Sequence, residues 1–154
     1  GGSFTKFCKQ IGVIPRTDII SSKKIPAPQL VAHTFESGRT LVPPQDGAPL
    51  YKHVAAIFEI DYFRSEDDYI LKADVSNSPI ADAIKKNTGL EANRFEDIFD
   101  IVKATKEQAT IFGCQPNTPL LLVSQTILTQ DRQILYYNEQ YIFSERYKYV
   151  VSYV

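Results

Sequence analysis

The 154-residue sequence has little cysteine, histidine and glycine, and each scarcity excludes a class of site. Cys8 and Cys114 are the only cysteines, so at most one disulfide bridge can form, and we expect two free thiols instead of a disulfide framework. His33 and His53 are the only histidines, with no cysteine or carboxylate around them at zinc-ligand spacing, so we expect no metal site. The seven glycines are scattered, which argues against a glycine-rich phosphate loop.

Charge and hydropathy exclude further classes of partner and location. There are 17 basic and 18 acidic side chains, and a net charge of −1 gives no general attraction to nucleic acid or to anionic membranes. The apolar runs are shorter than a membrane span, and no N-terminal stretch has the form of a signal peptide. With 44% hydrophobic residues, the chain can build one good core. We therefore expect a single cytoplasmic domain over 1–154.

The C-terminal third has the clearest secondary-structure pattern. Thr105 and Gln108 form a capping-box pattern, which predicts the start of a helix that ends at Gly113. Two β-type runs follow, over 120–129 and 134–143. The polar residues between them favour a turn, so we expect an antiparallel hairpin.

The rest of the chain predicts a mixture of helices and hairpin-linked strands. The stretch 29–50 looks loop-like, with a possible short helix over 30–35, because it is rich in glycine and proline. Linked strands with helices between the groups predict an α+β domain, an antiparallel sheet of about six strands with flanking helices. The remaining predicted elements are a helix over 3–12, strands over 17–25, 54–64, 69–76, 95–104 and 147–154, and a helix from Ser78 to Gly89.

No catalytic pattern stands out. There is no nucleophile elbow, and the acidic groups at 66–68 and 96–100 are more typical of a solvated turn and a strand than of a catalytic pair. Six of the nine tyrosines lie between Tyr136 and Tyr153. Most of them suit the packing of half-buried strand surface, and one or two could line a ligand pocket.

Arg64 has the strongest physical case for binding a ligand. It alternates in phase with Ile60 and Tyr62, which places it on the apolar side of its predicted strand. An arginine there must reach solvent or find an anion, because a buried unpaired guanidinium is costly. The alternative is a surface pair with Glu66 or Asp68 at the hairpin end.

The order of these motifs resembles a known family. A helix ends near Gly113-Cys114, a strand begins with TPLL, and an aromatic strand closes on ERYKY. The opening SFTKFCKQIGVIPRTDII adds a short helix, a glycine and a first strand. Together they resemble the UTRA domain, the effector-binding half of GntR/HutC-type bacterial transcriptional regulators. The resemblance implies a chorismate-lyase-like fold and a homodimer, with a winged-helix DNA-binding domain elsewhere in a longer protein.

The resemblance also implies a ligand site. In that family a strand carries Arg-x-Arg before a turn, and DYFRSEDDYILKAD falls at that place, with Arg64 as the second arginine and Tyr62 in place of the first. A helix start in the family helps to hold a ligand phosphate, and Ser78 stands near its serine. The implied ligand-binding residues are Arg64, Tyr62, Asp74, Ser78, Tyr136 and Glu139.

These observations favour a sensor domain without a catalytic residue, a metal or a cofactor. The implied effector is a small anionic metabolite, either a sugar phosphate or a carboxylate, and operator DNA would be contacted only through the other domain. Two alternatives are an enzyme of chorismate-lyase-like fold and a dimerisation module with a vestigial pocket. The lack of a histidine base or a paired arginine set speaks against the enzyme.

Overall fold

The computed structural model describes residues 7–10, 12, 14–24, 33–42, 54–63, 67–72 and 80–153, and for 14–24, 33–42, 54, 68 and 71 it describes the backbone alone. No helix among these residues combines the length and the apolar character that crossing a membrane requires.

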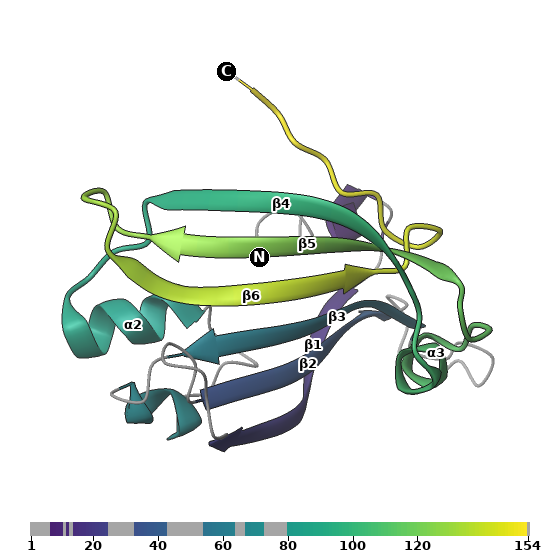
Figure 1. Ribbon diagram of the computed structural model, residues 1–154, viewed down its shortest axis with the longest axis horizontal. Helices are drawn as coiled ribbons and strands as arrows, with labels where there is room; N and C mark the ends of the chain where they lie inside the picture. The colour runs from purple at the N-terminus through teal and green to yellow at the C-terminus, as the bar shows by residue number, and fades with distance from the viewer. Residues whose placement is uncertain are drawn as a thin grey trace.

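The described strands form one antiparallel sheet of six, in the order β1-β2-β3-β6-β5-β4 (Figure 1). The centre of the sheet is therefore β3 with β6, and β1 and β4 are its edges. This confirms the predicted α+β class. The strands are β1 (Ile14–Lys24), β2 (His33–Val42), β3 (Val54–Phe63), β4 (Arg94–Lys103), β5 (Pro119–Leu128) and β6 (Ile134–Ile142).

The prediction was wrong in three segments. The stretch predicted as loop contains β2, which pairs with β1 on one side and β3 on the other, so ladder hydrogen bonds override its weak strand pattern. The strand predicted over 69–76 is, where described, the 3₁₀ helix η1 (Asp68–Lys72). Its Ile70 is fully buried beside Phe63 and packs with Ile84 of the helix that follows. Residues 147–153 form no strand, because Tyr147 turns into the core instead.

Helix α3 (Lys106–Phe112) begins and ends as its sequence predicts. The Thr105 hydroxyl accepts from the Gln108 N–H at 3.1 Å, and the Gln108 side chain accepts from the Thr105 N–H at 3.0 Å. These two bonds satisfy N–H groups that the first turn of a helix leaves without partners. Gly113 ends the helix with a φ of 66°, a left-handed conformation that glycine adopts without steric cost.

The predicted hairpin is confirmed as β5 and β6. Its turn is held by the Thr129 N–H, which donates to the Gln133 carbonyl at 2.9 Å, and by the Thr129 hydroxyl, which accepts from the Gln133 N–H at 3.0 Å. Arg132 takes a φ of 69° in this turn and pairs with Glu96 at 2.6 Å. The turn therefore sets the register between β5 and β6 and contacts β4.

The helices cover the sheet at its two ends (Figure 1). Helix α2 (Ile80–Thr88) ends before Gly89 as predicted, and its buried Ile84 packs with Phe63 and Ile127. We call the side of the sheet that carries these contacts the α2 face. Helix α3 packs on the opposite side, the α3 face, where Phe112 stacks on Phe143 with ring centroids 5.8 Å apart.

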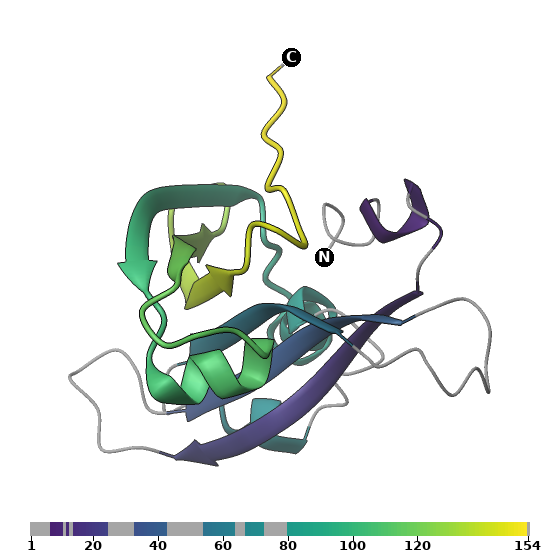
Figure 2. The same ribbon diagram turned by 90° about the vertical axis from the view of Figure 1, so that its right-hand side faces the viewer.

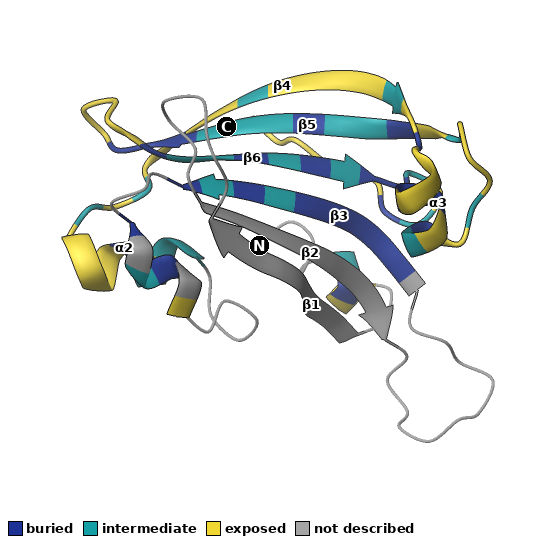
Figure 3. Cartoon of the chain, turned by 60° about the horizontal axis from the view of Figure 1, so that its bottom comes forward, coloured by how far each residue is buried: buried dark blue, intermediate teal, exposed yellow. Residues whose placement is uncertain are grey.

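A second hydrophobic cluster lies on the α2 face, away from α2. It joins Ile57, Val123 and Ile142 of the sheet with Cys8 from the helical turn at 7–10 and with Tyr147. Figure 2 shows that helical turn beside the segment that follows β6. Burial is deepest in β3 and falls toward β4, which is largely exposed (Figure 3).

Candidate functional site

A row of polar side chains crosses the α2 face between its two hydrophobic clusters. Asp61 of β3 pairs in register with Asn138 of β6, which pairs with Gln125 of β5, which pairs with Asp97 of β4. Residues paired in register on neighbouring antiparallel strands point to the same face of a sheet. A second pair, Glu59 and Gln140, stands beside this row on the same face. We call these six residues the polar band.

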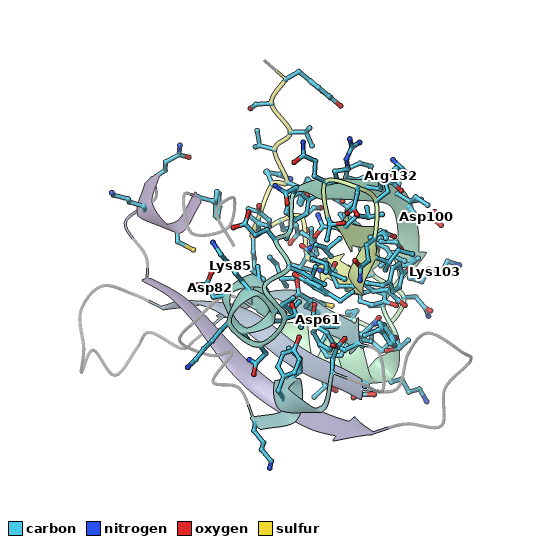
Figure 4. The ribbon with its side chains drawn as sticks, turned by 90° about the vertical axis from the view of Figure 1, so that its left-hand side faces the viewer. Asp61, Asp82, Lys85, Asp100, Lys103 and Arg132 are labelled. Atoms are coloured by element: carbon cyan, nitrogen blue, oxygen red, sulfur yellow. The ribbon has the colours of Figure 1, made fainter. Side chains whose placement is uncertain are left out.

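The polar band is buried at its centre. Asp61 is 2% exposed, Glu59 and Asn138 are 4% exposed, and Gln140 is 9% exposed. Figure 4 shows Asp61 in the interior, whereas Asp100, Lys103 and Arg132 lie on the outside. Buried polar groups cost free energy unless they are hydrogen-bonded, so a band of this depth needs a structural or functional reason.

The amides of the band make long hydrogen bonds to one another. Asn138 Nδ2 donates to Gln125 Oε1 at 3.5 Å, and Gln140 Nε2 donates to Asn138 Oδ1 at 3.4 Å. Typical bonds of this kind are close to 2.9 Å, so both contacts are weak. The central amides can therefore exchange these weak bonds for shorter ones to another molecule.

At the β4 end of the band the hydrogen bonds are shorter. Gln125 Nε2 donates to Asp97 Oδ1 at 2.8 Å, and the Tyr149 hydroxyl donates to Asp97 Oδ2 at 3.2 Å. The Tyr149 ring also packs edge-on against Phe99, with centroids 5.7 Å apart. Burial, reinforced by the Asp97 carboxylate, raises the pKa of Tyr149 to about 12.

This pKa predicts a loss of stability at high pH. The folded-state pKa of Tyr149 lies above its ordinary value of 10.0, so the stability linked to its neutral hydroxyl is complete below pH 10 and is lost as pH rises through about 12. We expect Tyr149→Phe to lose less stability than the wild type between pH 10 and 12, measured by denaturant unfolding. Tyr153→Phe, at a side chain 94% exposed, is the control and should follow the wild type. Equal losses in the wild type and Tyr149→Phe would contradict this assignment.

The predicted ligand residues that the structure describes lie on different faces. Tyr62 pairs in register with Tyr137, and Glu139 with Ile60, which places Tyr62 and Glu139 on the α3 face. There the Tyr62 and Tyr137 rings have centroids 5.8 Å apart. Tyr136 lies on the α2 face and stacks on Phe63 at 5.1 Å. Arg64, Asp74 and Ser78 lie outside the described residues, so their role stays a prediction.

Glu139 has a close partner on its own strand. The Tyr141 hydroxyl donates to Glu139 Oε2 at 2.8 Å. Burial, together with this bond, raises the pKa of Tyr141. The contact makes Glu139 part of a tyrosine cluster on the α3 face.

The buried centre of the polar band was not predicted from the sequence. Its signal was present: Glu59 and Asp61 are in phase with Ile57 and Phe63 along β3, so two acidic side chains share a face with large apolar ones. Charged residues in phase with core residues on a central strand are rare unless they are paired or functional. The alternation alone could not show that β3 is central, because that depends on its pairing with β2 and β6.

The polar band suits the binding of a small polar molecule. It offers carboxylate acceptors and amides that can both donate and accept, between two apolar walls. Among the described residues, the band itself contains no serine, cysteine, histidine or lysine.

Comparisons with known proteins support the fold described above. The family model of the UTRA domain matches residues 10–148. A search of curated proteins found no match. Among solved structures, the effector domain of PhnF from Mycobacterium smegmatis superimposes with a TM-score of 0.77 and 15% identity, covering 99% of this chain and 95% of that one.

Two further structures are similar. The ligand-binding domain of a protein described as a GntR-family transcriptional regulator, from Bordetella bronchiseptica, gives a TM-score of 0.73 at 16% identity, covering 93% of this chain and 91% of that one. A structure of PhnF itself gives a TM-score of 0.77 at 16% identity, covering 99% of this chain and 69% of that one. At these identities the likeness concerns the fold.

Proposed function

The chain belongs to the UTRA domain family, and from this premise we propose that it is the effector-binding part of a GntR-type transcriptional regulator. One similar structure is described as the effector domain of PhnF, and another as the ligand-binding domain of a GntR-family transcriptional regulator. Effector binding would change the affinity for operator DNA of a winged-helix domain in the same regulator. A regulator of this kind acts in the cytoplasm and, on two-fold operators, as a homodimer.

The observation that carries this proposal is the pair of buried amides Asn138 and Gln140, whose hydrogen bonds are 3.4 to 3.5 Å long. A purely structural network gains its stability from short, well-aligned bonds. Long bonds at such depth instead suit a site that is completed when a ligand replaces them. Glu59 and Asp61 stand beside these amides and add acceptors for hydroxyl or amino groups of the ligand.

We further propose that the effector is a small anionic metabolite, a sugar phosphate or a carboxylate, and that Arg64 binds its anionic group. Arg64 directly follows Phe63, the last residue of β3. A guanidinium offers a planar set of donors that suits a carboxylate or a phosphate. The amides and carboxylates of the polar band would then bind the polar remainder of the molecule.

The test is thermal unfolding of the 154-residue chain with a panel of sugar phosphates and carboxylates. A compound present at 100 times its dissociation constant should stabilise the fold by about 2.7 kcal/mol. A panel without any stabilising compound would contradict an anionic effector.

The role of Arg64 is tested by Arg64→Ala. We expect this variant to fold normally and to lose most of the stabilisation by the compound that stabilises the wild type. Lys148→Ala, at an exposed basic residue outside the polar band, is the control and should respond like the wild type. An undiminished response in Arg64→Ala would place the anion elsewhere.

A further inference from the structure

Edge strand β4 exposes large apolar side chains on both of its faces. Phe95 is 57%, Phe99 50% and Ile101 76% exposed on the α2 face, and Ile98 is 71% exposed on the α3 face. In Figure 3 this strand is the most exposed of the described part of the sheet. A long apolar edge strand is a liability in a free monomer, because it can pair with other chains. Its presence here indicates that the edge is normally covered.

Alternate backbone groups of β4 face away from β5. The strand pairs with β5 over all ten residues without a register shift, and with no other described strand. The Ile101 N–H donates to Asp100 Oδ1 at 2.8 Å, so it points away from β5. Because alternate residues of an edge strand turn their backbone groups outward, those of Phe95, Asp97, Phe99 and Lys103 also face out.

We propose that β4 pairs antiparallel with β4 of a second copy of this chain, centred on Phe99, to form one continuous sheet across a two-fold axis. This inference deepens the homodimer of the proposed function by naming its surface. A second copy suits the edge because a two-fold axis brings identical outward backbone groups into register as hydrogen-bonded pairs.

Charge disfavours three of the possible centres of this pairing. When β4 pairs with β4 of a second copy in a continuous sheet, odd-numbered residues face odd-numbered ones and even-numbered residues face even-numbered ones. The two-fold axis therefore passes through one residue position, the centre of the pairing, and any residue of the strand can take that position. Centring on Asp97 or on Asp100 places that carboxylate opposite its own copy, and centring on Ile98 places Glu96 opposite Asp100. Like charges directly opposite each other are destabilising.

Centring on Phe99 avoids all of these clashes. Phe99 then meets Phe99 of the second copy at the axis, and Ile98 stands opposite Asp100. Each Asp97 lies diagonal to Lys103 of the other copy, so two opposite-charge neighbours are added. Asp100 and Lys103 both lie on the outside of the molecule in Figure 4, where a second copy can reach them.

The register makes a prediction that depends on the sign of one charge. Ile98→Asp would place two carboxylates opposite each other at two equivalent positions, whereas Ile98→Lys would place an ammonium opposite each Asp100. Both variants remove the same exposed apolar side chain, so their effects on folding should be similar. We expect Ile98→Lys to remain a dimer and Ile98→Asp to dimerise about tenfold more weakly or worse, measured by sedimentation equilibrium.

Other outcomes would overturn the proposed surface. A monomeric wild type would exclude it, and equal weakening by both substitutions would indicate apolar packing without this register. If the wild type is a monomer but a panel compound still stabilises it, the surface is wrong and the effector-binding function stands. If the dimer behaves as expected and no compound stabilises it, the surface stands and the effector-binding function is wrong.

A crosslink provides an independent measure of the centre. Residues of a hydrogen-bonded antiparallel pair have Cα atoms about 5.5 Å apart, within the range of a disulfide. In a Cys114→Ser background, Phe99→Cys should give a disulfide-linked dimer on mild oxidation. Ile101→Cys, which lies opposite Asp97 in this register, should not. Crosslinking of Ile101→Cys instead of Phe99→Cys would overturn the register.

Discussion

Replacing Phe112 by alanine should destabilise the fold by about 3–5 kcal/mol, the largest effect that we expect from a single substitution. Phe112 is 1% exposed, stacks on Phe143, and packs with Leu120 and Phe58 in the cluster under α3. Its removal leaves a cavity between α3 and the sheet. A seven-residue helix cannot close this cavity without losing its own contacts, because isolated helices of this length are unstable.

Denaturant unfolding followed by circular dichroism measures this effect. Tyr153→Ala removes an aromatic side chain that is 94% exposed, and it should change the free energy of unfolding by roughly 0.5 kcal/mol at most. A loss of less than about 1 kcal/mol in Phe112→Ala would mean that α3 contributes little to the core. The α3 face would then be held by β3, β5 and β6 alone.

Replacing Asn138 by leucine should abolish the response to effector without weakening the fold. Asn138 is 4% exposed, and its two side-chain hydrogen bonds are 3.4 and 3.5 Å long, so leucine removes little hydrogen-bond energy and adds apolar contact. We expect the free energy of unfolding to change by about 1 kcal/mol at most, because the two bonds that are lost are long and weak. The ligand-induced gain of about 2.7 kcal/mol should disappear, because the central amide of the site is gone.

The two measurements in this experiment separate function from structure. If the polar band were a structural network, Asn138→Leu would destabilise the fold by leaving neighbouring amides without partners. Asn87→Leu is the matched control, because its amide is exposed on α2 and donates within the helix to the Ala83 carbonyl at 2.8 Å. That variant should bind effector normally. A strong destabilisation by Asn138→Leu, with its ligand response intact, would exclude the proposed role.

Local chemistry made several elements predictable. The start of α3 follows from the reciprocal bonds of Thr105 and Gln108, and its end follows from the left-handed Gly113. Both depend on residues within one or two turns of each other. The hairpin of β5 and β6 is similarly local, since a polar turn joins two β-rich runs. Such features could be predicted because the interactions that decide them are close in sequence.

Elements that depend on distant partners were missed. The β2 segment has a weak strand pattern and becomes a strand because β1 and β3 flank it. The η1 segment looked like a returning strand, yet Ile70 is drawn into the cluster of Phe63 and Ile84. Tyr147 was predicted on a last strand and packs instead against Phe7, with ring centroids 5.1 Å apart. Each of these outcomes was decided by contacts between segments far apart in the chain.

The candidate site divides in the same way. The sequence by itself determined the α+β class, the hairpin, the capped helix and the resemblance to UTRA domains, because periodicity and turn chemistry depend on residues that are close together in the sequence. Only the tertiary structure placed Tyr62 and Glu139 on one face and Tyr136 on the other. It alone joined Asp61, Asn138, Gln125 and Asp97 into one row, since strand order and register, which no local pattern encodes, decide which side chains meet across a sheet.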